Sequence, residues 1–384
     1  MVDDEEQARI ALLGQLREAL RGVIDIKRYA WDARGYLTLD GPAQRDERDF
    51  YRALAQRCAA FGVVPHAWRE RRGDVVVTLR PAPAIGAPRW RWPVVLFIAT
   101  LLTTTLTGAL NELDGCVITA EQLWRLLTPA GLAAGLPFSL TLIGILLAHE
   151  LGHYLMARRH GEAAGLPHFI PLPPPLSITG TLGAVIVQQA PQRDRRTILE
   201  VGIAGPLAGM LVAVPALLYG LSISPVGPLP AELAGCTILQ EGDSLLTLAA
   251  ERLVLGQTLP AGGVDVWLSP VAFGAWIGLL VTMINLLPVG QLDGGHIAYA
   301  VLGRSARYLG GATIAACLIA GALVPDATMW LTMGLMGLFI GVRHPLPVDD
   351  ITPLGAGHRA LACAGLLLFL VLLLPVPLRV LGGP

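Results

Sequence analysis

The segment LLAHELGHYLMARRHG, residues 146 to 161, contains two histidines four positions apart, His149 and His153, with Glu150 directly after the first. A helix turns by about 100° per residue, so this pair lies on one face, where both imidazoles can bind one metal ion. Glu150 projects beside the pair, where its carboxylate can accept a proton from water rather than bind the metal. The pattern predicts a metal-dependent hydrolase. The alternative is a chance match in a helix whose histidines bond to neighbours.

The motif lies in an apolar chain. The 384 residues are 53% hydrophobic and 15% charged, and the mean hydropathy is +0.58. Soluble domains carry about 25% charged residues, so this composition is typical of a membrane protein. Ionisable side chains inside a membrane are costly and mark functional sites by default. The setting therefore favours the catalytic interpretation of His149, Glu150 and His153.

A third ligand is needed, because a catalytic zinc usually has three protein ligands and one open position. The segment NLLPVGQLDGGH, residues 285 to 296, offers Asp293 just after a helix break at Pro288 and Gly290. Irregular backbone at membrane depth is tolerated where protein or a water-filled cavity satisfies it. The alternative is that Asp293 is a turn or N-cap residue. We favour a metal ligand, because Asp293 is expected at the same membrane depth and on the same side of the membrane as the two histidines. We expect His296 to be a polar helix-end residue, with a supporting or reserve ligand as the alternative.

Seven apolar segments approach the ~20 residues that cross a hydrocarbon core, and we expect six to seven spans. They are residues 93–111, 137–157, 198–222, 268–289, 307–324, 327–342 and 360–380. Arginines flank the connections on one side and acidic residues dominate the loops on the other. By the positive-inside rule, the N-terminus and both motifs lie toward the cytoplasm.

Residues 1–88 differ from the rest of the chain. Residues 1–92 hold 29 of the 57 charged side chains, 16 basic and 13 acidic. Helical spacing predicts helices at 5–22 and 45–61, and extended runs predict strands at 24–31, 35–41 and 73–81. The predicted fold class is thus a polytopic α-helical membrane protein, residues 89–384, with a small soluble α+β N-terminal head. No chemical motif stands out in the head, so a regulatory partner is its default role. The net charge of −1 and the lack of a long basic stretch argue against a nucleic-acid partner.

The two motifs together resemble the site-2 protease family of intramembrane zinc metalloproteases. The wider pattern ARRHG, PHFIPLPPP, GTLGAVI and GIAGPLAG is similar to the bacterial and chloroplast branch with a soluble head, and the match covers about residues 137–305. The resemblance implies one Zn²⁺ per chain, held by His149, His153 and Asp293, with Glu150 as the catalytic base. It also implies cleavage of transmembrane segments of membrane-protein substrates near the cytoplasmic face.

Substrate contacts are expected in the segment PLPPPLSITGTLGAVIVQQAP, residues 171 to 191. Its prolines forbid a regular helix, and TLGAVIVQ has the β-branched content of a strand. An added strand would hold an extended substrate, whereas the alternative is a re-entrant loop that only packs. The family resemblance favours substrate contact at Gly180, Thr181 and Gly183. Asn285 is expected to donate to the substrate or an oxyanion, with helix capping or packing as the alternative.

Other functions stay open. A metal or solute transporter could place His and Asp on broken helices at one depth, although no convincing inverted repeat is present. A membrane scaffold that binds zinc without turnover is the other alternative. Gly205 and Gly209 have GxxxG spacing, typical of close helix packing. A disulfide between Cys116 and Cys236 is chemically allowed, with free thiols as the default. The acidic N-terminus shows no signal or transit peptide, and a bacterial plasma membrane is the expected location.

Overall fold

The computed structural model describes residues 4–70, 73–83, 86, 90–113, 119–174, 176–228 and 237–382. The chain forms two compact units. The first unites Met1–Gly86 with Gln189–Ile198 and Pro345–Arg359, and the second holds Ala87–Gln188, Leu199–His344 and Ala360–Pro384. The head boundary predicted at residue 88 stays a prediction, and the two later segments of the first unit were not expected from the sequence.

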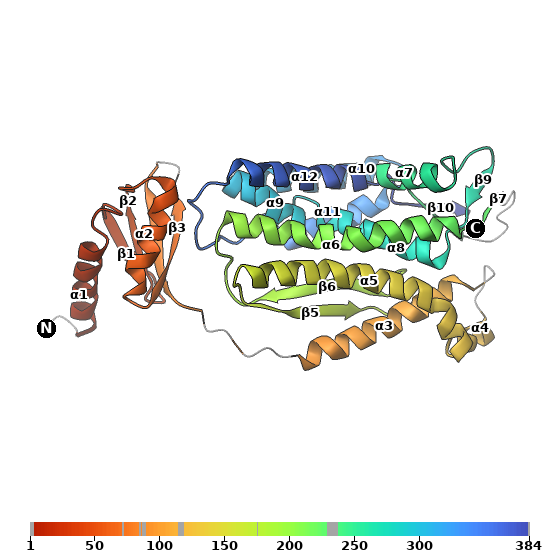
Figure 1. Ribbon diagram of the computed structural model, residues 1–384, viewed down its shortest axis with the longest axis horizontal. Helices are drawn as coiled ribbons and strands as arrows, with labels where there is room; N and C mark the ends of the chain where they lie inside the picture. Colours follow the sequence, from red (N-terminus) through yellow and green to blue (C-terminus); the bar gives the residue numbers. More distant parts are fainter. Residues whose placement is uncertain are drawn as a thin grey trace. The chain divides into compact units, whose positions relative to one another are not determined.

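The first unit is an antiparallel sheet with two helices, seen in red and orange in Figure 1. The sheet has the strand order β1-β2-β4-β3. The helices are α1 (Asp4–Ala19) and α2 (Glu47–Ala59), and the strands are β1 (Arg28–Trp31), β2 (Leu37–Gly41), β3 (Val63–Arg69) and β4 (Val75–Pro81). Leucines of α1 and apolar residues of α2 pack on alternate residues of β2 and β4 in one hydrophobic core.

Helix α2 shows how the sequence forms this core. The Asp46 carboxylate accepts hydrogen bonds from the backbone N–H groups of Arg48 and Asp49, which caps the helix start. Phe50, Leu54 and Cys58 follow at spacings of four, so they share one face, and all three are fully buried. Burial raises the pKa of the Cys58 thiol to about 12, so it stays a neutral core residue.

We expect Leu54→Ala to lower the free energy of unfolding of the first unit by about 2–5 kcal/mol, because Leu54 is 0% exposed and the cavity left behind adds to the lost burial. Denaturant unfolding of the full chain, followed by hydrogen exchange in residues 37–79, measures this. Gln56→Ala on the exposed face of the same helix is the control. Equal unfolding of the two variants would contradict the packing described.

Strand β3 was not predicted from the sequence. It contains Pro65, which has no backbone N–H and is usually confined to edge strands. Pro65 is tolerated because β3 is an edge strand of the four-stranded sheet. Beyond it, the backbone N–H of Ala67 donates to the Val348 carbonyl at 2.9 Å, and Asp350 N–H donates to the Ala67 carbonyl at 2.9 Å. A segment nearly 300 residues away in sequence thus borders the sheet.

The second unit is mainly helical (Figure 1). Its helices are α3 (Arg91–Asn111), α4 (Ala120–Leu126), α5 (Pro129–Arg159), α6 (Arg195–Ser222), α7 (Leu245–Val254), α8 (Pro270–Asn285), α9 (Asp293–Leu302), η1 (Gly303–Ser305), α10 (Ala306–Leu323), α11 (Thr328–Ile340) and α12 (Ala356–Leu372). The first turns of α6 and α12 belong to the first unit. Helix α5 packs against α3 and α8, and α10 packs against α11.

Among the described residues, four helical stretches are long and apolar enough to cross a membrane: α3, α5, α6 and the run from Asp293 to Leu323. Helices α8, α11 and α12 are apolar but shorter. Every segment predicted as a span is helical over most of its length, while the count of six to seven spans stays a prediction. The segment predicted at 360–380 is helical only to Leu372, because Pro375 and Pro377 follow and cannot continue the helix.

Short strand pairs complete the unit. Strand β10 (Leu378–Gly382) pairs with β8 (Thr237–Glu241), and β7 (Val226–Pro228) pairs with β9 (Val264–Val266). Strand β5 (Ala164–Pro171) pairs antiparallel with β6 (Thr181–Gln188), which coincides with the strand predicted from TLGAVIVQ. Cys116 and Cys236 lie outside the described residues. Cys317 is a buried free thiol, and Cys363 is an exposed one.

Candidate functional site

Three side chains meet where α5 and α9 approach each other. The Nε2 atoms of His149 and His153 lie 3.1 Å apart. Asp293 Oδ2 lies 3.1 Å from Nε2 of His149, and Asp293 Oδ1 lies 3.3 Å from Nε2 of His153. The side chains are 3%, 13% and 12% exposed for His149, His153 and Asp293, so the cluster is largely closed to solvent. The structure therefore brings together the three predicted ligands.

This cluster fits a zinc ion. Zinc–nitrogen and zinc–oxygen distances of about 2.0–2.2 Å in a tetrahedron place neighbouring donor atoms about 3.3–3.6 Å apart. The two Nε2 atoms are 3.1 Å apart, and each lies 3.1 or 3.3 Å from one oxygen of Asp293, which is close to that spacing. Two imidazoles and one carboxylate also form a donor set that zinc accepts, with one position left for water or substrate.

The tautomer of His153 is fixed by a neighbouring helix. Its Nδ1 lies 2.7 Å from the Val201 carbonyl in α6, so Nδ1 carries a proton and donates it there. The Nε2 lone pair of the neutral ring then points to His149 and Asp293. A ligating histidine held in this way has the orientation and basicity that a metal needs. This role of Val201 cannot be seen in the sequence, because any residue type carries a backbone carbonyl that can accept the bond.

Glycines of α6 make room for the histidines. A Cβ atom built on Gly205 would lie 2.1 Å from Nε2 of His153, whereas one on Gly209 would lie 3.4 Å from the nearest His149 atoms. On the facing helix, a Cβ on Gly152 would lie 2.5 Å from the Ala204 carbonyl oxygen. The expected close packing at the GxxxG spacing is present, and at Gly205 it is packing against a candidate ligand itself.

Asp293 is placed by the break between α8 and α9. The N-cap position of α9 is Leu292, which has no side-chain cap bond, and Asp293 is the first helical residue. Its carboxylate is thus free of the capping role considered from the sequence and faces the histidines instead. A Cβ on Gly294 would lie 1.9 Å from the Leu286 carbonyl oxygen, so the chain doubles back too tightly there for any larger residue.

Glu150 is buried, at 7% exposed, and its electrostatic neighbours are His153 and Asp293. His296 lies outside the cluster: its Nδ1 is 2.6 Å from Nε2 of His344, whose ring stacks on Tyr299 at 4.3 Å between centroids. His296 lies in the first turn of α9, as expected of a polar helix-end residue, and its role stays a prediction; its contact with His344 was not visible in the sequence.

The residues expected to contact substrate have packing partners of their own. A Cβ on Gly180 would lie 2.6 Å from the Thr104 Cα, and its carbonyl accepts a bond from the Thr103 hydroxyl at 2.7 Å. The Thr181 hydroxyl donates to the Ile170 carbonyl at 2.9 Å and accepts from Gly183 N–H at 3.0 Å. The bond from Thr103 fastens the β5–β6 hairpin to α3, and the bond from Thr181 to Ile170 holds β5 and β6 together. Their role in substrate binding stays a prediction.

Asn285 is the last residue of α8 and is half-buried. The expected role of Asn285 as a donor to substrate also stays a prediction.

Comparison with known proteins identifies the family. The family description "Peptidase family M50" matches residues 137–323, which run from α5 to α10 and include the whole cluster and Glu150. This segment is similar to peptidase family M50. The resemblance to the site-2 protease family seen in HELGH and NLLPVGQLDGG is confirmed, because M50 is that family.

Curated proteins similar to this chain are named as zinc metalloproteases. It is 32% identical over 246 residues to "Probable zinc metalloprotease EGY1, chloroplastic" and 34% identical over 250 residues to "Probable zinc metalloprotease EGY2, chloroplastic", both from Arabidopsis thaliana. The alignments cover 63% and 65% of this chain and 43% of each relative, so the chain spans less than half the length of these relatives. No solved structure matches the chain.

Proposed function

We propose that this protein is an intramembrane zinc metalloendopeptidase that cleaves transmembrane segments of membrane-protein substrates. The observation that carries the proposal is the cluster of two imidazole nitrogens from α5 and the Asp293 carboxylate from α9, in which the nitrogens lie 3.1 Å apart and each faces one carboxylate oxygen at 3.1 or 3.3 Å, with a buried glutamate next to the first histidine. The M50 match and the names of the relatives support the same class of reaction.

The residues divide the chemistry among them. His149, His153 and Asp293 would hold the zinc, which when bound supplies a Lewis acid that polarises a carbonyl and makes water nucleophilic near neutral pH. Glu150 accepts the proton of the attacking water and then delivers it to the departing amine nitrogen. Asn285 donates to the substrate carbonyl, where developing negative charge is greatest.

A substrate helix must unwind before its carbonyls can be attacked, because a helix uses them in internal hydrogen bonds. Strand β6 offers a place for the unwound segment: among the described strands it pairs with β5 alone, and Leu182, Val185 and Val187 are 68%, 50% and 54% exposed. Adding a substrate strand at Gly180, Thr181 and Gly183 would satisfy its backbone and present its carbonyls.

The proposal also covers the membrane in which the enzyme lies and the side of that membrane on which it cleaves. The arginine distribution supports an N-terminal head and a cleavage site on the cytoplasmic side, where a regulatory partner can bind the head. A bacterial plasma membrane is the location proposed from the sequence, whereas the names of the matched relatives are chloroplastic. Regulated intramembrane proteolysis is the process that these features together suggest.

Glu150→Gln separates the protease from a transporter or an inactive zinc scaffold. We expect the variant to keep about one zinc per chain, because Glu150 is not among the three ligands, and to lose roughly 100- to 10,000-fold in cleavage rate, as for loss of a general base. The measurement is the zinc content of detergent-purified protein, together with cleavage of a reconstituted transmembrane substrate analysed by mass spectrometry.

Gln291→Ala, an exposed change two residues before Asp293, is the control and should match wild type in both assays. Undiminished cleavage by the Glu150→Gln variant would rule out the proposed mechanism. Zinc-loaded wild type that cleaves no transmembrane segment would favour the scaffold, and zinc-dependent solute uptake untouched by Glu150→Gln would favour the transporter.

A further inference from the structure

The first unit contains a polar cleft of about 570 Å³ whose lining residues all belong to that unit. One wall is a face of α2, with Arg48, Tyr51 and Arg52 at helical spacing. The other wall is formed by residues 193–196 and by residues 352–358, which lie just before and within the starts of α6 and α12. The volume falls within the range of about 300–1,000 Å³ that small-molecule sites occupy.

The cleft carries an excess of positive charge. Four of its lining residues are arginines, Arg48, Arg52, Arg193 and Arg196, and two are aspartates, which leaves a formal charge of +2 without His358. Burial and the nearby Asp349 carboxylate raise the pKa of Tyr51, so Tyr51 stays neutral and adds no negative charge.

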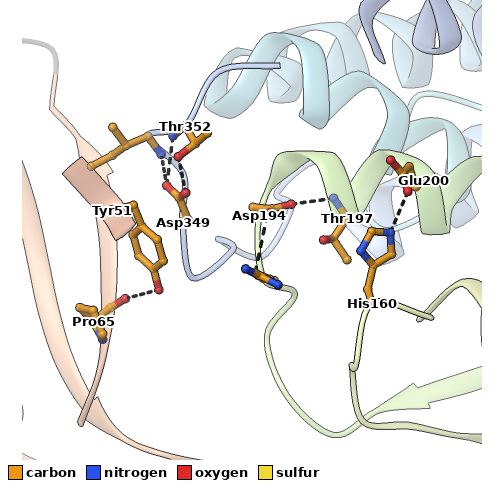
Figure 2. A network of polar contacts seen from close by, with 10 residues as sticks. Tyr51, Pro65, His160, Asp194, Thr197, Glu200, Asp349 and Thr352 are labelled. Atoms are coloured by element: carbon orange, nitrogen blue, oxygen red, sulfur yellow. Dashed lines mark hydrogen bonds and ion pairs between the residues drawn. The ribbon is translucent and has the colours of Figure 1, made fainter. Parts of the chain in front are cut away.

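The two aspartates already have partners within the fold (Figure 2). Asp349 is 4% exposed and accepts hydrogen bonds from the N–H groups of Ile351 and Thr352, at 2.9 and 3.0 Å, and from the Thr352 hydroxyl. Asp194 Oδ1 accepts the Thr197 N–H at 2.7 Å. Both carboxylates therefore shape the loops and the α6 start. Asp194 Oδ2 also lies 3.9 Å from Nε of the exposed Arg193, so the aspartates offset the four arginines in part.

The arginines of α2 are held weakly. Arg52 pairs with Asp49 at 3.8 Å, with side-chain exposures of 75% and 59%, and such exposed pairs contribute little stability. Arg48 is also exposed on the first turn of α2. Both guanidinium groups can thus turn to a ligand without breaking a strong bond.

The walls, in contrast, are fixed by backbone bonds. The N–H groups of Val348 and Asp349 donate to the carbonyls of Gln192 and Arg193 at 2.9 and 2.8 Å. Arg195 Nε donates to Asp350 Oδ1 at 2.8 Å, which joins the two wall segments a second time. The Tyr51 hydroxyl donates to the Pro65 carbonyl at 3.1 Å, which ties α2 to β3 (Figure 2). A rigid wall reduces the ordering cost of binding.

We propose that this cleft binds a phosphate-bearing anion through Arg48, Arg52, Arg193 and Arg196. A planar guanidinium bonds two phosphate oxygens at once, which makes arginine the residue that best suits phosphate recognition. The cleft suits that chemistry because its arginines are clustered, its aspartates already accept hydrogen bonds from the fold, and its polar wall is held in place by backbone hydrogen bonds. The phosphate can belong to a free small molecule or to the headgroup of an anionic lipid.

The test uses the full chain in phosphatidylcholine nanodiscs and radiolabelled pyrophosphate in equilibrium dialysis. We expect saturable binding to wild type that weakens as salt is raised, because salt screens the charges. The Arg48→Gln/Arg52→Gln double variant should bind roughly tenfold more weakly or worse, because charge-assisted bonds are lost. The Arg21→Gln/Arg34→Gln double variant removes the same charge from exposed positions outside the cleft and should bind within about twofold of wild type.

A second arm adds short-chain phosphatidylglycerol. Displacement of pyrophosphate by this lipid, or arginine-dependent binding of the lipid alone, assigns the cleft to a lipid headgroup; pyrophosphate binding that the lipid leaves unchanged assigns it to a free phosphate. The proposal is overturned if neither ligand binds saturably, or if binding is equal in wild type and the Arg48→Gln/Arg52→Gln variant while circular dichroism shows both to be folded.

Discussion

We expect the Asp293→Ala variant to purify with little zinc and no measurable proteolysis, whereas wild type carries about one zinc per chain. Asp293 places one oxygen 3.1 Å from His149 and another 3.3 Å from His153, so its loss removes one of three ligands and the negative charge between two imidazoles. The two remaining ligands, His149 and His153, lie on one helix, so they contact the metal from one side only. Metal analysis of detergent-purified protein measures the result.

Asp293→Asn is the matched variant, since it keeps the size and one oxygen but removes the charge. We expect it to hold zinc more weakly than wild type and better than Asp293→Ala in a titration with a competing chelator. Size-exclusion chromatography and circular dichroism establish that each variant is folded. Full zinc in folded Asp293→Ala, or none in folded wild type, would contradict the proposed ligand set.

The ligands were predictable because each is marked by a local pattern. His149 and His153 lie on one face of any helix that contains them, and they are four residues apart. Asp293 lies 144 residues after His149, yet the helix break at Pro288 and Gly290 marked the place where a polar residue can be tolerated at membrane depth. Hydropathy placed both motifs near the same end of their segments.

The supporting groups were not predictable, because their roles depend on distances across the fold. The Val201 carbonyl could belong to any residue, and His344 shows no spacing that links it to His296. The same holds for the first unit: residues 348–350 join β3 through backbone bonds that ignore side-chain identity. Strand β3 itself was missed because Pro65 is atypical of a strand inside a sheet.

Hydropathy predicted the positions of the helices better than it predicted which helices are long enough to cross a membrane. Apolar runs at 268–289 and 327–342 correspond to α8 and α11, but those helices have 16 and 13 residues. A helix rises 1.5 Å per residue, so neither alone covers about 30 Å of hydrocarbon. Helix α8 is almost wholly buried by other helices, which explains its apolar composition without a full span of its own.

We expect Gly205→Ala to reduce zinc content and proteolysis nearly as far as Asp293→Ala does. The added methyl group would lie 2.1 Å from Nε2 of His153 and 2.5 Å from two ring carbons, far inside van der Waals contact. The ring cannot simply move away, since its Nδ1 is bonded at 2.7 Å to the Val201 carbonyl one turn earlier on the same helix. Either that bond breaks or α6 shifts, and both displace the ligand atom.

Gly209→Ala is the control, one turn further along α6. Its methyl group would meet His149 at 3.4 Å, an ordinary contact, and alanine favours a helix over glycine by about 1 kcal/mol. We therefore expect Gly209→Ala to keep its zinc and its activity within about twofold of wild type. Zinc analysis and substrate cleavage on folded protein compare the two. Wild-type zinc content in Gly205→Ala would contradict the displacement of His153. Equal loss in both variants would show that these glycines serve helix packing in general rather than the placement of His153.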